Sequence, residues 1–372
     1  MSWESNMNRY YHLVPSTKAV LEGDIWIAGF SGGKDSTAMV TWIEWLRRSG
    51  QLKVEKPILV RSDTTVEFPF LVEIAEELEA VLRKTGWECH RVTPRRKDRL
   101  YVKIFGQGTT PVNPGYKRMR WCTQSTKISP MKRFRKTRGK NVMALTAIRW
   151  GESTSRDRKI QATCSAGGEC GVVQTSSKEN IFGPILEWTI SQVITWLSGT
   201  LDQMEVRQYM TDIFPLTKRL LKAYSITKDS RKPLPLIESE RASCGQVADP
   251  LRFGCVGCPA IANDKVVTHN IGERPEWEWL RAIQKIWDDL RLPFNRCCRM
   301  KNGELQYGPI KMEVRKKYFL QLLEIQERSG VTLVTEKDIA LIHKCWKDSV
   351  YPRGWSEADE LSMAAPNESR LF

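Results

Sequence analysis

Apolar residues in the first half of the chain alternate between short runs and longer stretches with helical spacing. Short runs rich in β-forming residues occupy 24–30, 57–61, 88–92 and 142–148, and helical patterns lie between or after them at 37–48, 67–84 and 129–138. Strands separated by helices predict right-handed crossovers and a mostly parallel, twisted sheet with helices on both faces. We therefore expect an α/β fold that binds ligands at the carboxyl ends of its strands.

The second half of the chain reads as mainly helical. Helical patterns cover 189–197, 276–290, 314–328 and 336–347, with a cysteine-bearing loop at 241–262 and Cys297–Cys298 between two of the helices. The sequence predicts an α/β domain over residues 1–200, a smaller helical region carrying the cysteines over 201–355, and a tail over 356–372.

Composition favours a packed protein in a reducing compartment. Hydrophobic residues make up 41% and charged residues 27%, which supports a core. No apolar run approaches the ~20 residues that span a bilayer, and the first residues lack the pattern of a signal peptide, so we expect a cytoplasmic protein without membrane contact. Ten cysteines are too sparse for a disulfide scaffold, so clustered ones are read as metal ligands or reactive thiols.

Positive charge is concentrated in one segment. The chain carries a net charge of +15, and residues 95–140 hold fifteen Lys and Arg against one acid, Asp98. This distribution indicates a polyanionic partner such as nucleic acid, a phosphate-rich ligand, or both. The aromatic residues of the segment could stack on bases or serve ordinary core packing; they are Tyr101, Phe105, Tyr116 and Trp121.

The segment between the first strand and the first helix is the most informative. It contains Ser31, Gly32, Gly33, Lys34, Asp35 and Ser36. Glycines allow a sharp turn whose N–H groups bind an anion, the following helix N-terminus adds partial positive charge, and the lysine supplies a cation. The loop therefore predicts a phosphate site. It lacks the GxxxxGKS/T spacing of the loop found in kinases and GTPases.

Further charged residues are candidates for the same ligand. Lys127, Arg149 and Arg156 could face a triphosphate or a second anionic substrate, since arginine contacts suit phosphate. Either Asp35 or Asp63 could hold the Mg²⁺ that accompanies a triphosphate, and the sequence leaves that choice open.

Three cysteines have the spacing of a metal site. Cys244, Cys255 and Cys258 form C-x10-C-x2-C, and the CxxC part places two thiolates on one turn. A 4Fe–4S cluster, structural zinc and unliganded thiols are the alternatives, because spacing alone does not separate zinc from iron. Cys297 or Cys298 would supply a fourth ligand, or one position would stay open.

Several of these stretches resemble one protein superfamily. SGGKDS at 31–36 resembles the PP-loop of the ATP pyrophosphatases, which split ATP between the α- and β-phosphates and adenylate a substrate. RSDTTVEFP, WCTQSTKISP, AIRWGES with Arg156, and PILEWT are similar to elements of phosphoadenosine phosphosulfate (PAPS) reductase-like proteins. Within this group the chain most resembles the DndC-type sulfurtransferases of DNA phosphorothioation.

The resemblance implies an activity, cofactors and partners. It implies ATP and Mg²⁺, adenylation of a DNA backbone phosphate with release of pyrophosphate, and insertion of sulfur from a cysteine desulfurase alongside other DNA phosphorothioation proteins. It also favours iron over zinc, although Asp264 stands where that group has its fourth cysteine. Cys122 could carry a persulfide, because nearby cations lower the pKa of a thiol, or be a buried apolar residue.

Three other functions remain alternatives. A PAPS or adenosine phosphosulfate reductase is disfavoured, because the chain ends in Asn367–Phe372 without the cysteine nucleophile of the assimilatory enzymes, and Cys297–Cys298 follow the CxxC instead of preceding it. A tRNA-thiolating enzyme would share the chemistry and differ in the polymer. A non-catalytic nucleic-acid-binding component would have retained the loop without its reaction.

Overall fold

The computed structural model describes residues 11, 13–23, 25–114, 120–139, 142–151, 157–158, 160–162, 172–174, 180–200, 204–225, 254–262 and 264–360. Within this part the chain forms two compact units. Unit 1 comprises Met1–Ser62, Pro69–Val92 and Met131–Pro250, and unit 2 comprises Asp63–Phe68, Thr93–Pro130 and Leu251–Phe372, as far as each range is described. The units are thus not consecutive stretches of chain, whereas the sequence led us to expect a boundary near residue 200.

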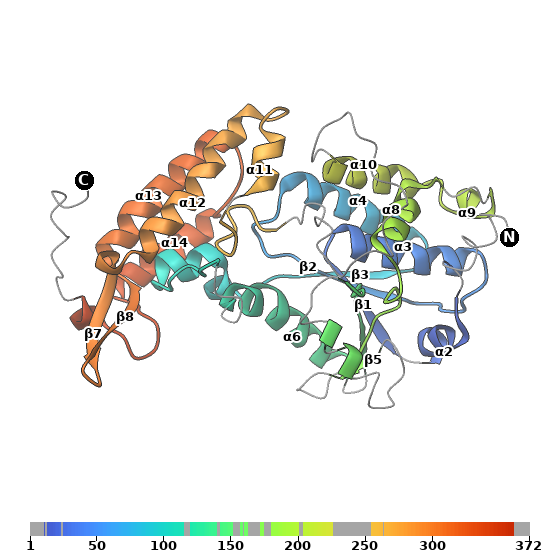
Figure 1. Ribbon diagram of the computed structural model, residues 1–372, viewed down its shortest axis with the longest axis horizontal. Coiled ribbons are helices and arrows are strands. Elements are labelled where there is room, and N and C mark those ends of the chain that lie inside the picture. Colours follow the sequence, from blue (N-terminus) through green and yellow to red (C-terminus); the bar gives the residue numbers. More distant parts are fainter. Residues whose placement is uncertain are drawn as a thin grey trace. The chain divides into compact units, whose positions relative to one another are not determined.

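Unit 1 is built on a six-stranded sheet in the order β3-β2-β1-β4-β6-β5 (Figure 1). All neighbouring strands pair in parallel except β5, which runs antiparallel to β6. The mostly parallel sheet confirms the expected fold class. The strands are β1 (Trp26–Phe30), β2 (Ile58–Ser62), β3 (Glu88–Val92), β4 (Met143–Leu145), β5 (Val172–Gln174) and β6 (Asn180–Phe182).

Alternation along β1 separates the two faces of the sheet. Trp26, Ala28 and Phe30 belong to a large buried cluster with residues of α2, α3, α4 and α8. Ile27 points to the opposite face, where α6 packs through Met131 and other apolar side chains. Helices therefore cover both faces, as predicted from the strand–helix alternation. The helices of this unit are α2 (Pro15–Gly23), α3 (Lys34–Arg48), α4 (Pro69–Lys84), α6 (Ser129–Thr137, entering from unit 2), α8 (Ile190–Ser198), α9 (Met204–Tyr209) and α10 (Phe214–Ser225).

A buried carboxylate fixes α3 in this core. The Glu44 side chain is fully buried and accepts hydrogen bonds from Arg47 Nη1, Arg48 Nε and Trp87 Nε1, each at 2.7 Å. Charge-assisted hydrogen bonds of this kind compensate for the loss of hydration that burial imposes on a carboxylate. The helix that begins at Lys34 is thereby held by a polar network at its far end.

Unit 2 contains the expected helices and one element that the sequence analysis missed. Its helices are α5 (Trp121–Thr123), α11 (Lys265–Asn270), α12 (Ala282–Arg291), α13 (Met312–Ser329) and α14 (Glu336–Lys347), with π-helical turns at Val102–Gly106 and Gln124–Ile128 and 3₁₀ turns at Arg96–Asp98, Pro275–Arg281, Pro293–Asn295 and Glu357–Asp359. Part of the basic segment at residues 95–140 thus takes helical conformations.

The missed element is a β-hairpin of β7 (Arg296–Lys301) and β8 (Glu304–Ile310). Asn302 and Gly303 connect the strands with φ angles of 54° and 82°. An Asn-Gly pair favours the tight turn that needs positive φ at both positions, so this dipeptide was the overlooked signal. Cys297 and Cys298 consequently lie on a strand, not in a loop between helices.

A buried arginine organises the interior of unit 2. Arg315 donates from Nε to the Ile310 carbonyl at 2.7 Å and from Nη1 to the Val350 carbonyl at 2.9 Å, and its guanidinium lies 4.3 Å from the Tyr351 ring centroid. Gly108 has φ of +76°, and a Cβ there would lie 2.4 Å from the Arg315 guanidinium. Glycine is required at this position because both the conformation and the space exclude a side chain.

No helix in the described part of the chain is both long enough and apolar enough to cross a membrane.

Candidate nucleotide loop and cysteine turn

The candidate phosphate loop leaves the carboxyl end of β1 and enters α3 directly. Gly32 has φ of +71°, and a Cβ there would lie 3.4 Å from the Cβ of Ala75 on α4. Gly33 caps α3 without a side-chain hydrogen bond. The first N–H groups of α3 therefore follow directly after a glycine turn. This arrangement binds anions at helix N-termini.

Two serines close the loop on itself. The hydroxyls of Ser31 and Ser36 lie 2.9 Å apart, and Ser36 Oγ donates to the Gly33 carbonyl at 3.0 Å while accepting from the Ser31 N–H at 3.2 Å. These bonds hold the backbone in one conformation, so the loop is organised before any ligand binds.

A chain of alternating charges extends from the loop to the end of β4. Lys34 Nζ lies 2.9 Å from Asp35 Oδ2, and Arg149 Nε lies 2.7 Å from Asp35 Oδ1. Arg149 follows β4 by four residues and also donates from Nη1 to the Trp188 carbonyl at 3.2 Å. Burial alone would raise the pKa of Asp35, but the charges of Lys34 and Arg149 outweigh it and hold the pKa below its ordinary value. Asp35 is therefore a carboxylate that aligns two cations.

Tyr224 is a residue of this site that the sequence analysis missed. The Lys34 N–H donates to the Tyr224 hydroxyl at 3.2 Å, and Lys34 Nζ lies 5.7 Å from the centroid of its ring. Tyr224 lies in α10, 190 positions along the chain from Lys34. No local pattern connects residues that far apart, so only the fold reveals the contact.

The other predicted nucleotide residues fall elsewhere. Asp63 and Lys127 belong to unit 2, and Arg156 lies outside the described residues. Asp63 is buried and its Oδ1 accepts from the Thr65 N–H at 2.6 Å, which shapes the turn after β2. Within unit 1, the structure thus joins Ser31–Ser36 with Arg149, and the roles of Asp63, Lys127 and Arg156 stay predictions.

The CxxC turn of unit 2 is held by contacts on both sides. The Val256 N–H donates to the Val66 carbonyl at 2.7 Å, and Trp287 Nε1 donates to the Gly257 carbonyl at 2.7 Å. Gly257 has φ of +61°, and a Cβ there would lie 2.6 Å from the Ile283 side chain. A tight turn with a left-handed glycine places Cys255 and Cys258 on the same loop, as the spacing predicted.

Two further predicted residues lie within electrostatic reach of this turn. Burial raises the pKa of Cys255 to about 11, and the positive charge of Lys127 is the strongest opposing influence. Burial also raises the pKa of Cys258, and a charge on Cys122 would raise it further. The structure therefore gathers Cys122 and Lys127 near the CxxC turn.

The expected activation of Cys122 by cations is wrong. Burial, followed by the charge of Cys255, raises the pKa of the Cys122 thiol, and no cation of the described part of the chain is among the main influences on it. The basic side chains of this segment are offset by the loss of hydration at the thiol. Its role as a sulfur carrier stays a prediction without that support.

The remaining cysteines do not complete a metal site among the described residues. Cys297 and Cys298 are buried on β7, and burial followed by Glu360 raises the pKa of Cys297 to about 11. No three His, Cys, Asp or Glu side chains in the described ranges are placed to bind one metal ion, and Cys244 lies outside those ranges. The chemistry of the CxxC turn fits two thiolate ligands, so a complete site requires donors from beyond the described part.

Asp264 stands where the resemblance described in the sequence analysis predicts a fourth cysteine. Its carboxylate caps a helix. Its Oδ1 accepts from the Val266 and Val267 N–H groups at 3.1 and 3.2 Å and so caps α11. Burial raises the pKa of this carboxyl.

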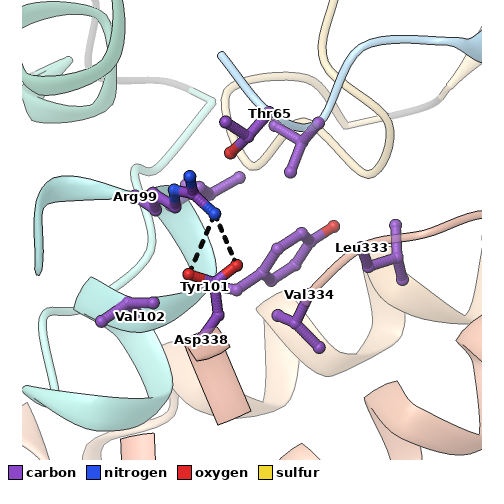
Figure 2. A pocket seen from close by; sticks show the side chains of 9 residues that line it. Thr65, Arg99, Tyr101, Val102, Leu333, Val334 and Asp338 are labelled. Atoms are coloured by element: carbon purple, nitrogen blue, oxygen red, sulfur yellow. Dashed lines mark hydrogen bonds and ion pairs between the residues drawn. The ribbon is translucent and has the colours of Figure 1, made fainter. Parts of the chain in front are cut away.

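The basic segment divides its charges between internal pairs and solvent. Arg99 forms two hydrogen bonds with Asp338 at 3.0 and 2.8 Å, and Figure 2 shows this pair beside Tyr101 in a pocket of unit 2. An internal ion pair therefore lines this pocket. Tyr101 and Phe105 are buried in the core, which excludes them as base-stacking residues, and Tyr116 lies outside the described residues. Exposed cations of the segment include Arg95, Lys97, Arg120 and Lys136.

Comparison with known proteins gives a family match for part of the chain. Residues 25–202 match the family described as the phosphoadenosine phosphosulfate reductase domain. No curated protein matches the sequence.

Three solved structures are similar to parts of the chain. The PAPS reductase of Candida auris in complex with phosphate has 15% identity and a TM-score of 0.35, over 54% of this chain and 87% of that chain. The FMN adenylyltransferase of Candida glabrata has 14% identity and a TM-score of 0.29, over 52% of this chain and 55% of that chain. The U34-tRNA thiolase of Methanococcus maripaludis with its 4Fe–4S cluster has 13% identity and a TM-score of 0.32, over 71% of this chain and 87% of that chain.

The match at residues 25–202 takes in β1, the phosphate loop and Arg149. The part of the chain that carries the candidate nucleotide loop is therefore similar to the phosphoadenosine phosphosulfate reductase domain.

Proposed function

We propose that this chain is an ATP-dependent sulfurtransferase that adenylates a DNA backbone phosphate, releases pyrophosphate and allows sulfur to enter. The observation that carries the proposal is the serine-closed loop at the end of β1, joined through Asp35 to Lys34 and Arg149. Fixed N–H groups and two aligned cations suit a triphosphate, whose charge they neutralise during transfer.

The reaction needs two displacements at phosphorus. In the first, a non-bridging oxygen of the DNA phosphate attacks the α-phosphorus of ATP, the α–β bond breaks, and pyrophosphate leaves. The loop amides and Lys34 would bind the leaving β- and γ-phosphates, and Arg149 would face the charge that develops on the oxygen between the α- and β-phosphorus atoms. In the second, a nucleophile at the oxidation level of sulfide attacks the adenylated phosphorus, and AMP leaves with the oxygen.

Sulfur handling belongs to the cysteines predicted as metal ligands in this proposal. Cys255 and Cys258 would hold an iron–sulfur cluster with Cys244 as a third thiolate, and Lys127 stabilises the ionised form of Cys255 that a metal requires. Such a cluster supplies an iron that binds sulfide when only three thiolates ligate it. A cysteine desulfurase would be the sulfur donor, and the exposed cations of the basic segment would contact the DNA backbone.

The first test follows the phosphates of ATP. The full-length protein is incubated with ATP labelled at the β-phosphate, Mg²⁺, sulfide and either DNA or tRNA as acceptor. Labelled pyrophosphate is the expected product, and Lys34→Ala should eliminate it. Lys18→Ala is the matched control, because Lys18 is a partly exposed lysine of the same unit that pairs with Glu22. Products limited to ADP and orthophosphate would contradict the proposal.

The second test identifies the acceptor. Nuclease digestion and mass spectrometry of the DNA should reveal dinucleotides in which one oxygen is replaced by sulfur. Sulfur found in tRNA nucleosides and not in DNA would assign the chemistry to RNA.

A second candidate function is reduction of a sulfonucleotide, which the match at residues 25–202 favours. The same preparation supplied with PAPS and a dithiol reductant would then release sulfite. Sulfite release without pyrophosphate release would replace the proposal with this alternative.

A further inference from the structure

The segment that follows β2 is folded against the CxxC turn. The Val66 carbonyl accepts the Val256 N–H at 2.7 Å, and Glu67 pairs with Cys255 in an isolated antiparallel β-bridge. Thr64 is fully buried, and its Oγ1 lies 3.6 Å from Cys255 Sγ, which is within hydrogen-bond distance for the larger sulfur atom. The backbone and a side chain of this segment therefore both contact the loop that carries the predicted metal ligands.

The backbone of this segment is strained between the two contacts. Thr65 has φ of 69°, a left-handed conformation that is rare for a β-branched residue. Asp63 Oδ1 accepts the Thr65 N–H at 2.6 Å and holds the turn. Strain of this kind persists only where the surrounding structure fixes it, and it concentrates at functional sites. The strained turn sets the Thr64 side chain and the Val66 carbonyl against the same loop.

The hydroxyl of Thr64 suits a cysteine that ligates a metal. A protonated Cys255 donates to Thr64 Oγ1, whereas a ligating cysteine has lost this proton and its sulfur can only accept. A hydroxyl can rotate to donate to that sulfur. Burial raises the pKa of Cys255 to about 11, and the hydrogen bond with Thr64 is among the influences that lower it. The hydroxyl thus favours the ionised form that a metal ligand must adopt.

A purely structural role for the hydroxyl is the alternative. Thr217 illustrates such a role, because it is buried and its Oγ1 donates to the Leu197 carbonyl at 2.6 Å. A neutral thiol is a weak hydrogen-bonding partner, so the contact of Thr64 with Cys255 would stabilise the fold little. A thiolate is a charged acceptor, and hydrogen bonds to charged groups are the stronger ones. The choice of partner therefore favours a role at the metal ligand.

We infer that Thr64 is a positioning residue for the metal ligand Cys255, donating its hydroxyl proton to the thiolate and fixing the direction in which the sulfur points. This inference rests on the proposed function, because it takes Cys255 as a ligand of the iron–sulfur cluster. Outer partners of metal ligands orient the ligand and tune the metal, and loss of one typically lowers metal affinity by about tenfold to a hundredfold.

The experiment uses an iron–sulfur cluster assembled anaerobically in the full-length protein from iron and sulfide. Visible absorbance follows the loss of the cluster to a chelator, and a redox titration gives its reduction potential. In Thr64→Val, half of the cluster should be lost at a chelator concentration about tenfold lower or less. Its potential should shift to a more negative value, because hydrogen bonds to the sulfurs help to set the potential. Thr64→Ser retains a hydroxyl and should restore both quantities.

Thr217→Val is the matched control. It also removes a buried threonine hydroxyl, but from unit 1 and from a bond to a backbone carbonyl. It should lower the thermal unfolding midpoint and leave the chelator sensitivity and the potential of the cluster unchanged. If Thr64→Val behaves like this control, or if Thr64→Ser fails to restore the potential, the inference is overturned.

The outcomes also separate the inference from its premise. If the unaltered protein assembles no cluster, the sulfur-handling part of the proposed function fails and the inference fails with it. If the unaltered protein assembles a cluster and Thr64→Val keeps the same potential, only the inference fails. Thr64→Ala removes the hydroxyl without placing a methyl group in its position, and it is measured in the same way if Thr64→Val does not fold.

Discussion

The ion pair between Asp35 and Arg149 should be measurable as a coupling free energy. The perturbation is a double-mutant cycle of Asp35→Asn, Arg149→Met and the double variant. Arg149 is 6% exposed, and its Nε meets Asp35 Oδ1 at 2.7 Å, so the pair is shielded from water on the arginine side.

The magnitude follows from the number of bonds and their burial. A hydrogen bond between charged groups contributes about 1.5–3 kcal/mol net, and the bond from Arg149 to the Trp188 carbonyl adds about 1 kcal/mol. Asp35 keeps its contact with Lys34 when Arg149 is lost. The coupling free energy between Asp35 and Arg149 should therefore lie toward the lower end of the range for a hydrogen bond between charged groups. We expect Arg149→Met to lower the free energy of unfolding by about 2–3 kcal/mol, of which about 1–2 kcal/mol is coupling to Asp35.

The assay is urea unfolding followed by tryptophan fluorescence at several pH values. The pKa of Asp35 is lowered in the folded protein, so its contribution is present above the unfolded pKa of about 3.9 and is lost as pH falls through the folded pKa. Asp35→Asn should therefore remove stability at neutral pH and make the acid limb of the profile less steep.

Additive effects would refute the reasoning. If the two single changes sum to the double variant within about 0.5 kcal/mol, the two side chains do not interact as described. An Asp35→Asn protein with an unaltered acid limb would likewise show that the ionisation of Asp35 does not stabilise the fold.

Three further changes test other parts of the fold. Glu44→Gln leaves the guanidinium groups around it with a neutral partner, and we expect a loss of about 3–5 kcal/mol in urea unfolding; a loss below about 1 kcal/mol would show that the network is relaxed by water. Gly257→Ala forces a Cβ within 2.6 Å of Ile283 at a left-handed position. The metal content per chain in the purified protein should therefore fall while pyrophosphate release persists, and full metal content would contradict the assigned turn. Arg315→Met removes three carbonyl contacts within unit 2 and should lower its thermal unfolding midpoint, with a normal midpoint counting against the role given to this arginine.

The strand–loop–helix at residues 26–48 was predictable because each part carries its own local pattern. An apolar run, a glycine turn and an amphipathic helix stand in sequence. Arg149, a candidate for the same anionic ligand because arginine suits phosphate, contacts Asp35 of the loop. β3 begins and ends at the predicted residues, Glu88 and Val92.

The features that the sequence did not predict depend on contacts between residues far apart in the chain, on burial that opposes nearby charges, or on neighbouring patterns. The contact of Tyr224 with Lys34 joins residues far apart in sequence, for which no spacing rule exists. The raised pKa of Cys122 depends on how deeply the thiol is buried, whereas the sequence displays only the cations around it. The hairpin at Asn302–Gly303 was readable, but the helical patterns on either side concealed it.

The chain crosses between its two units after residues 62, 68, 92, 130 and 250. Neither unit can therefore be excised as one continuous piece for expression. A truncated protein that stops at residue 250 would retain Tyr101 and Phe105 but lose Trp287 and Phe319, the aromatic rings against which they stack.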